Sequence, residues 1–169
     1  LDLLHNVAAA DDSRFDWSSF SVTNGTLVAG QQGVVDNLVD LVPGLDLEVS
    51  GSLDINIGNF VLAAGTFTIS QQSPDTIDDG QEISLTDPSL LLIQLTDVYL
   101  FAGVDGTFVR DVNDVVTGFP EVGGDVAQGL ADAGAVGFFV ENATLDLAIV
   151  GENPENPAGE APRSWVGVA

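Results

Sequence analysis

Hydrophobic and polar residues alternate without interruption over residues 45–57, whose sequence is LDLEVSGSLDINI. The odd positions carry Leu, Val, Ile or Gly, and the even positions carry Asp, Glu, Ser or Asn. A period of two places successive side chains on opposite faces of an extended backbone. The pattern therefore predicts a long β-strand with an apolar face in a core and an acidic face in water, and we expect the rest of the chain to be organised around it.

The residues that follow predict a partner for this strand. Gly58 and Asn59 form a two-residue turn signal, and residues 60–70, FVLAAGTFTIS, continue with apolar and β-branched residues. Two such segments joined by a short Gly/Asn turn are typical of a β-hairpin, so we expect a long antiparallel pair. Residues 90–103 are apolar at nearly every position, which predicts a central strand covered on both faces.

The pattern changes at three other places along the chain. Residues 136–150 predict another strand, which we expect to be interrupted at Asn142 and Ala143. Apolar residues recur at helical spacing over 32–42, and this predicts a short amphipathic helix. A weaker helical pattern covers 126–131.

Together these elements predict an all-β fold of long antiparallel strands, arranged as a sandwich or an open β-roll, with one short amphipathic helix at about 32–42. At 169 residues the chain is long enough to bury a core without disulfides. We expect residues 1–169 to form a single β-rich module. Both ends break off in apolar, strand-like sequence, so we expect the module to be excised or processed from a longer chain.

Acidic residues strongly outnumber basic ones: 26 Asp and Glu face only three Lys and Arg, giving a formal net charge of −23. Such a chain repels phosphate backbones and anionic lipids, so we expect no nucleic-acid binding. No apolar run approaches the roughly 18 residues that a membrane span needs, so we expect no membrane insertion. The acid excess also fits adaptation to a high-salt habitat, an alternative that concerns environment rather than function.

Two groups of acids in loops are candidate metal ligands. Calcium takes six to eight oxygen ligands from carboxylates, amides and backbone carbonyls of loops, and both groups offer these atoms. Neither group has the spacing of an EF-hand, and solvated turns in a very acidic protein are the alternative. The candidate calcium ligands are Asp75, Asp78, Asp79, Glu82, Asp105, Asp111 and Asp114.

Candidate catalytic residues are scarce. The chain has no cysteine, which excludes thiolate nucleophiles, and its one histidine, His5, lies near the N-terminus without a recognisable triad around it. With 26 acids, some pair will lie at the separation that glycosidases use, so acid pairs alone indicate nothing. We therefore assign no catalytic residue and expect no enzyme, while an acid-pair glycoside hydrolase stays open as an alternative.

The β-hairpin sequence is similar to that of a known class of proteins. The segments VPGLDLEVSGSLDINIG (42–58), FVLAAGTFTIS (60–70), LTDVYLFAGVDG (95–106), VGFFVENATLDLAIV (136–150) and SWVGVA (164–169) resemble the repeating units of very large secreted bacterial surface proteins and adhesins. This resemblance implies a module of a tandem array outside the cell, often with calcium. The chain lacks the glycine-rich nonapeptide of calcium-binding β-rolls, so the resemblance assigns no ligand.

A structural role is the function that these observations favour. Open strand edges invite strand addition, so we expect an extracellular repeat or subunit of an adhesin, surface layer or filament that binds copies of itself or neighbouring repeats. Calcium would stabilise the junctions. The alternative is a module that binds carbohydrates or another ligand, with cell-surface glycans as partners. The Asp and Glu residues on the polar face of 45–57 speak against it, because a flat row of Thr or aromatic side chains is expected there.

Overall fold

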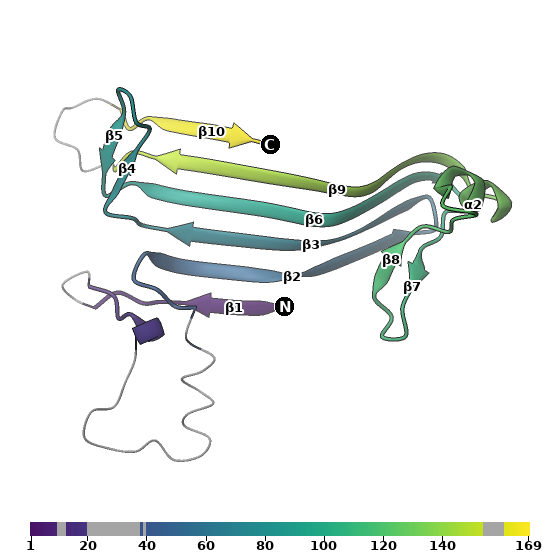
Figure 1. Cartoon of the computed structure of the whole chain (residues 1–169), viewed down its shortest axis with the longest axis horizontal. Coiled ribbons are helices and arrows are strands. Elements are labelled where there is room, and N and C mark those ends of the chain that lie inside the picture. Colours follow the sequence, from purple (N-terminus) through teal and green to yellow (C-terminus); the bar gives the residue numbers. More distant parts are fainter. Residues whose placement is uncertain (10–12, 20–37, 39, 154–160) are drawn as a thin grey trace, which may run out of the picture. The chain divides into compact units, whose positions relative to one another are not determined.

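The computed structural model describes residues 1–9, 13–19, 38, 40–153 and 161–169 (Figure 1). These residues form long strands, two short hairpins and one α-helix, which confirms the all-β prediction. The elements in order are β1 (Asp2–His5), the 3-10 helix η1 (Trp17–Ser19), β2 (Leu45–Ile57), β3 (Val61–Gln72), β4 (Thr76–Asp78), β5 (Ser84–Thr86), β6 (Ser89–Val104), β7 (Val109–Arg110), β8 (Val116–Gly118), α2 (Val126–Asp132), β9 (Val136–Gly151) and β10 (Ser164–Val168).

The largest sheet has six strands in the order β1-β2-β3-β6-β9-β10. Neighbouring strands of this sheet run in opposite directions (Figure 1). Two smaller sheets are the hairpins β4-β5 and β7-β8. The chain divides into two compact units: unit 1 contains Leu1–Val49, Ile69–Leu92 and Leu147–Val168, and unit 2 contains Ser50–Thr68, Ile93–Asp146 and Ala169. Strands β2, β3, β6 and β9 contribute residues to both units.

The predicted hairpin at residues 45–70 is confirmed. Strands β2 and β3 are hydrogen-bonded neighbours, and Phe60 N donates to Ile57 O at 2.9 Å within the turn of residues 58–60 that joins them. Gly58 and Asn59 have φ values of 57° and 59°. Positive φ at both central residues is what a tight hairpin turn requires, and glycine and asparagine adopt it with little strain. Asn56 also supports the turn, because its side-chain oxygen accepts the Asn59 N–H at 2.9 Å.

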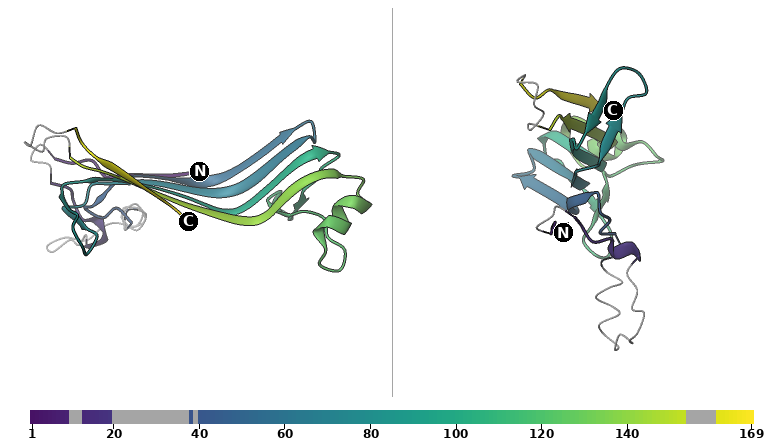
Figure 2. Two further views of the ribbon diagram at one scale, coloured as in Figure 1. Left: turned by 90° about the horizontal axis from the view of Figure 1, so that it is seen from above. Right: turned by 90° about the vertical axis from the view of Figure 1, so that its left-hand side faces the viewer.

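The core of unit 2 lies on one side of its sheet. Figure 2 shows α2 together with the β7-β8 hairpin on that side. Tyr99, Phe108 and Phe139 pack around a buried cluster that comprises Leu62, Phe101, Phe119, Val126, Leu130 and Ala135. Helix α2 begins at an N-cap, Asp125, whose carboxylate accepts the Gln128 N–H at 3.0 Å. An N-terminal cap of this kind satisfies a backbone donor that the helix itself leaves open.

The two helices predicted from the sequence have different outcomes. The weak helical pattern at 126–131 is confirmed by α2. The amphipathic helix predicted at 32–42 lies for most of its length outside the described residues, and Leu41 and Val42 at its end are not helical.

The long strands β6 and β9 depart from the sequence predictions in two ways. Strand β9 is not interrupted at Asn142; this residue instead has a φ of 50° inside a continuous strand. Asp97 in β6 has a similar φ of 51°. Left-handed residues inside strands are typical of β-bulges, and Asn and Asp tolerate this conformation better than most residues. Strand β6 is central as predicted, but it is not covered on both faces, since Ala102 and Val104 are exposed.

Unit 1 contains a buried polar side chain, Asn6, that joins three segments of the chain. Asn6 is only 4% exposed, and its side-chain amide donates to Phe15 O at 3.1 Å and to Val42 O at 3.0 Å. Its backbone N–H donates to Asp46 O at 3.1 Å. Leu45 and Leu85 are buried in the same unit. Satisfied buried amides of this kind fix the path of a segment, because leaving them unpaired is costly.

Candidate functional site

The first group of predicted calcium ligands lies on the β4-β5 hairpin of unit 1. At its tip, Asp79 N donates to Ile83 O at 3.0 Å, and the Asp79 carboxylate accepts the N–H groups of Gln81 at 2.9 Å and Ile83 at 3.0 Å. Asp78 accepts the Gly80 N–H at 2.6 Å. The two carboxylates therefore stabilise the turn itself.

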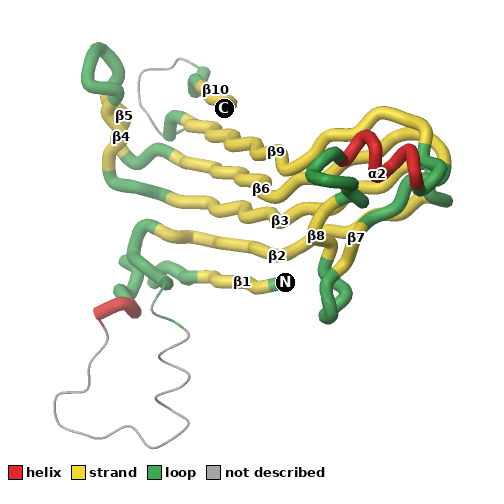
Figure 3. The backbone as a smooth tube through the Cα atoms, turned by 45° about the vertical axis from the view of Figure 1, so that its right-hand side comes forward, coloured by secondary structure: helices red, strands yellow, loops and turns green. Residues whose placement is uncertain are grey.

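The second group lies in unit 2, and the tip of the β7-β8 hairpin repeats the same loop (Figure 3). Asp111 N donates to Val115 O at 2.9 Å. The Asp111 carboxylate accepts the N–H groups of Asn113 and Val115, each at 2.9 Å. Both tips thus share the pattern Asp-x-x-x-Ile/Val, in which the aspartate caps two backbone donors. This shared spacing is present in the sequence and could have identified both aspartates as turn caps.

The seven candidate ligands are not gathered into one metal site. Asp75 and Glu82 lie with Asp78 and Asp79 on the β4-β5 hairpin of unit 1, whereas Asp105, Asp111 and Asp114 lie in unit 2. Among the described residues, no group of three or more His, Cys, Asp or Glu side chains has a geometry that could hold a metal ion. Calcium binding at these residues stays a prediction.

The two capping aspartates have lowered pKa values. Hydrogen bonds from the N–H groups of Gln81 and Ile83 lower the pKa of Asp79, and those of Val115 and Asn113 lower the pKa of Asp111. Each bond stabilises the charged carboxylate, and this favours deprotonation. A depressed folded-state pKa contributes stability that is present above the ordinary value of 3.8 and is lost as the pH falls through the folded-state pKa.

Replacing Asp111 with asparagine tests this capping role. The amide oxygen can still accept both N–H groups but does not titrate, so we expect the tip of β7-β8 in Asp111→Asn to lose the acid-dependent opening of the wild type. Amide exchange of Val115, measured by NMR from neutral pH to below pH 3.8, reports that opening. Asp132→Asn is the control, since this side chain lies on α2. The same pH dependence in Asp111→Asn as in the wild type would contradict the assignment.

Arg110 fastens the β7-β8 hairpin to strand β2 within unit 2. Its guanidinium lies 2.5 Å from the Asp54 carboxylate and 3.7 Å from that of Asp114, and it donates to Asp114 O at 3.0 Å. The side chains of Arg110 and Asp54 are about one-third exposed, so solvent weakens the pair and we assign it about 0–1 kcal/mol. The pair contributes little free energy, but it holds the β7-β8 hairpin beside the polar face of β2.

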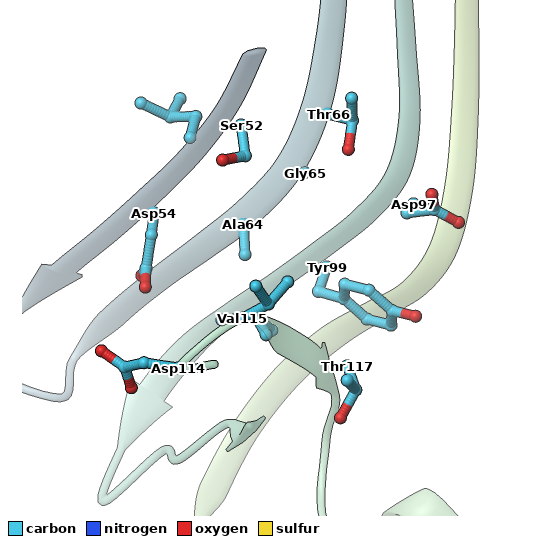
Figure 4. Close-up of a pocket in the computed structure, with 12 residues that line it drawn as sticks. Ser52, Asp54, Ala64, Gly65, Thr66, Asp97, Tyr99, Asp114, Val115 and Thr117 are labelled. Carbon is cyan, nitrogen blue, oxygen red and sulfur yellow. The ribbon is translucent and has the colours of Figure 1, made fainter. Parts of the chain in front are cut away.

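A cleft of about 370 Å³ lies between this hairpin and the sheet of unit 2 (Figure 4). Polar side chains from both walls line it; they include Ser52, Asp54, Thr66, Asp97, Tyr99, Asp114 and Thr117. Partial burial raises the pKa of the Tyr99 hydroxyl, and the nearby charges of Asp97 and Glu141 raise it further. The hydroxyl thus stays protonated and can donate a hydrogen bond. The lining suits a small polar or cationic solute.

In unit 2 the exposure of the two faces of β2 differs from the sequence prediction. The polar residues Ser52 and Asp54 line the cleft on the core side of the sheet, whereas the apolar residues Leu53, Ile55 and Ile57 are exposed. The prediction that the apolar face of this strand lies in a core is therefore wrong for residues 53–57. On the cleft side Asp54 pairs with Arg110, and its side chain remains about one-third exposed.

The opposite side of the unit 2 sheet is an apolar surface, which we call the open face. Its most exposed side chains are Leu53, Ile55, Ile57, Val104, Val136 and Phe138. Tyr99 and Phe101 of β6 and Phe139 of β9 pack in the core cluster, so the positions next to them in these strands, Phe138 among them, lie on the other side of the sheet. Helix α2 and the β7-β8 hairpin lie on the core side only, and no other described segment of unit 2 covers the open face (Figure 2).

The edge strand β10 in unit 1 is unusual in composition. Its residues Ser164–Val168 include no charge and no proline, and Val166 and Val168 are exposed. It pairs antiparallel with β9, with Val166 opposite Ile149. Arg163 flanks the strand, pairs with Glu152 at 3.0 Å and lies 5.2 Å from the Trp165 ring. Natural edge strands usually carry charges, prolines or bulges that prevent further pairing, and β10 has none of these among its five residues.

None of the helices in the described part of the chain has the length and apolar content that a membrane crossing requires. Comparison with family models, with curated proteins and with solved structures finds no match for this chain.

Proposed function

We propose that this protein is a structural subunit of an extracellular assembly, a surface layer, adhesin or filament, whose copies join through the edges of the six-stranded sheet. The observation that carries the proposal is the edge strand β10, whose five residues include no charge and no proline. The extracellular location rests on the resemblance to secreted bacterial surface proteins, and the chain's acidity is compatible with it.

The hydrogen-bond pattern identifies which groups of β10 face the free edge. Glu152 N donates to Arg163 O at 2.9 Å, and Asp146 and Ala169 exchange both backbone bonds at 2.9 and 3.0 Å. In an antiparallel pair the bonded residues alternate, so Trp165 and Gly167 bond toward β9. The N–H and C=O groups of Ser164, Val166 and Val168 consequently point away from β9, toward the edge. These groups are a template for another strand.

The strand order determines how a second copy would add. Strands β1 and β10 are the two edges of the sheet, and they run in opposite directions because six strands alternate between them (Figure 1). A copy shifted sideways without rotation would place its β1 antiparallel to β10 of the first copy. Contacts of this head-to-tail kind do not close, and they generate filaments. The net charge of −23 opposes the contact, so assembly is expected to increase with ionic strength.

Replacing Val166 with proline tests the proposal with little disturbance of the subunit. Proline removes the N–H of Val166, which points to the free edge, and leaves the bonds of Trp165 and Gly167 to β9 in place. We expect filaments of the wild type in high salt by electron microscopy, and their loss in Val166→Pro.

Val166→Ala is the matched control, because it shortens the same side chain but keeps the N–H. It is expected to form filaments. A wild type that stays unassembled at high protein concentration, or a Val166→Pro variant that assembles as the wild type does, would refute edge-to-edge joining. Calcium added in place of sodium chloride separates specific ion binding from screening, since only specific sites would promote assembly at micromolar concentration.

A further inference from the structure

We infer that the open face of unit 2 binds the open face of a second copy of this chain, so that two sheets pack into a sandwich. This contact is separate from edge-to-edge joining and does not depend on it. It uses residues of unit 2, whereas the free edge of β10 belongs to unit 1.

The apolar surface of the open face is extensive. Val136 is 70% exposed, Phe138 63%, Ile57 61% and Leu53 53%, although all four are in or at the ends of regular strands. The neighbouring positions on the same side, Ala63, Val98, Leu100 and Val140, are also apolar. Large contiguous apolar patches on a soluble protein mark sites of interaction, whereas single exposed apolar residues do not.

The area of the open face sets the size of the contact between two copies. With about half of each large side chain accessible, the open face offers roughly 600 Å² per copy, so that two copies would bury about 1,200 Å² in total. This value lies at the lower limit for specific protein interfaces. Two sheets that pack face to face lie about 10 Å apart with interdigitating side chains, and the mixture of Phe, Ile, Val and Ala on this face suits that packing.

The charge of the chain limits how two copies can approach each other. The formal net charge of −23 makes both an anionic membrane and another copy repulsive partners at most orientations. The residues that form the open face carry none of that charge, and Asp54, the acid of β2 within unit 2, lines the cleft on the other side of the sheet. Contact through this face keeps the acidic surfaces of two copies apart and buries only apolar side chains.

Pairing through the open face has a defined symmetry. A face that binds the same face of another copy forms a closed pair related by a two-fold axis. Such a pair saturates at two copies, whereas edge-to-edge joining does not. The two contacts therefore predict different masses for the same protein.

The experiment measures mass by light scattering in high salt, in the Val166→Pro background that prevents filament growth. We expect a mass about twice that of the 17.5 kDa chain. Adding Phe138→Glu is expected to reduce the mass to that of one chain, because a carboxylate would be buried in the interface without a partner. Val112→Glu adds the same charge at a fully exposed position of the β7-β8 tip, and it is expected to leave the pair intact.

Several results would overturn the inference. One is a single-chain mass at all concentrations in the Val166→Pro background, as occurs when another segment of the same chain covers the open face. Another is an equal loss of mass in Phe138→Glu and Val112→Glu, which would indicate general repulsion. Flotation with neutral lipid vesicles in place of pairing would assign the face to a membrane. None of these bears on the filament test, where Val166→Pro is compared with Val166→Ala.

Discussion

Replacing Phe101 with alanine is expected to lower the free energy of unfolding by about 3–5 kcal/mol. Phe101 is 1% exposed at the centre of the unit 2 core, and its ring centroid lies 6.4 Å from that of Phe119. Removing the ring loses its transfer free energy and leaves a cavity that strands β3 and β6 cannot close. Most domains of this size have a stability of only about 5–15 kcal/mol, so the loss is a large share of it.

Denaturant unfolding followed by circular dichroism measures this loss. Phe60→Ala is the matched control, because Phe60 follows the β2-β3 turn and is 58% exposed. We expect it to change the stability by less than about 1 kcal/mol. An equal effect of the two substitutions would show that the cluster around Phe101 is not the core of unit 2.

Replacing Gly106 with alanine is expected to destabilise the protein by about 1–3 kcal/mol, through overpacking rather than loss of packing. A Cβ at this position would overlap the ring of Phe101. The glycine is thus required by the close approach of an aromatic ring to the backbone. Gly44→Ala is the control, since a Cβ there would meet nothing within 4 Å.

The double variant Phe101→Ala/Gly106→Ala identifies the cause. If the methyl group that Gly106→Ala introduces clashes only with the Phe101 ring, removing the ring makes room for it, and the double variant loses less stability than the sum of the two single losses. Strict additivity would place the clash elsewhere. Thermal unfolding of the four proteins, with the wild type included, provides the cycle.

The local elements were predictable from the sequence where backbone preferences decide them. The β2-β3 hairpin follows from the two-residue turn at Gly58 and Asn59, and it is present. The helical pattern at 126–131 is also present as α2. These features depend on residues close together in sequence, so a single sequence contains the information that specifies them.

The use of the two faces of β2 could not be predicted in the same way. Alternation shows that one face is apolar and the other acidic, but it does not show which face the rest of the unit covers. The contact of Arg110 with Asp54 joins residues 56 positions apart, and it lies on the side of the sheet where the cleft is found. Long-range ion pairs leave no periodic signal.

The acidic loops show a similar limit. Seven acids offered the chemistry of a calcium site, and composition alone did not separate ligands from turn caps. In the structure, the carboxylates of Asp79 and Asp111 accept hydrogen bonds from backbone N–H groups two and four positions further along the same loop. In both tips a β-branched residue lies four positions after the capping aspartate. This spacing distinguishes a turn cap from a metal ligand, and it becomes visible only when the two tips are compared.

The two edge strands of the main sheet, β1 and β10, would give the proposed filament two different ends. Because β1 and β10 differ in sequence, one end of such a filament would display the Asp2–His5 strand and the other the Ser164–Val168 strand. The two ends would capture incoming subunits at unequal rates, because only one of them carries a charged residue in its outermost strand at neutral pH. Elongation would then be directional, and a soluble peptide copying β10 would cap the β1 end while leaving the other free to extend.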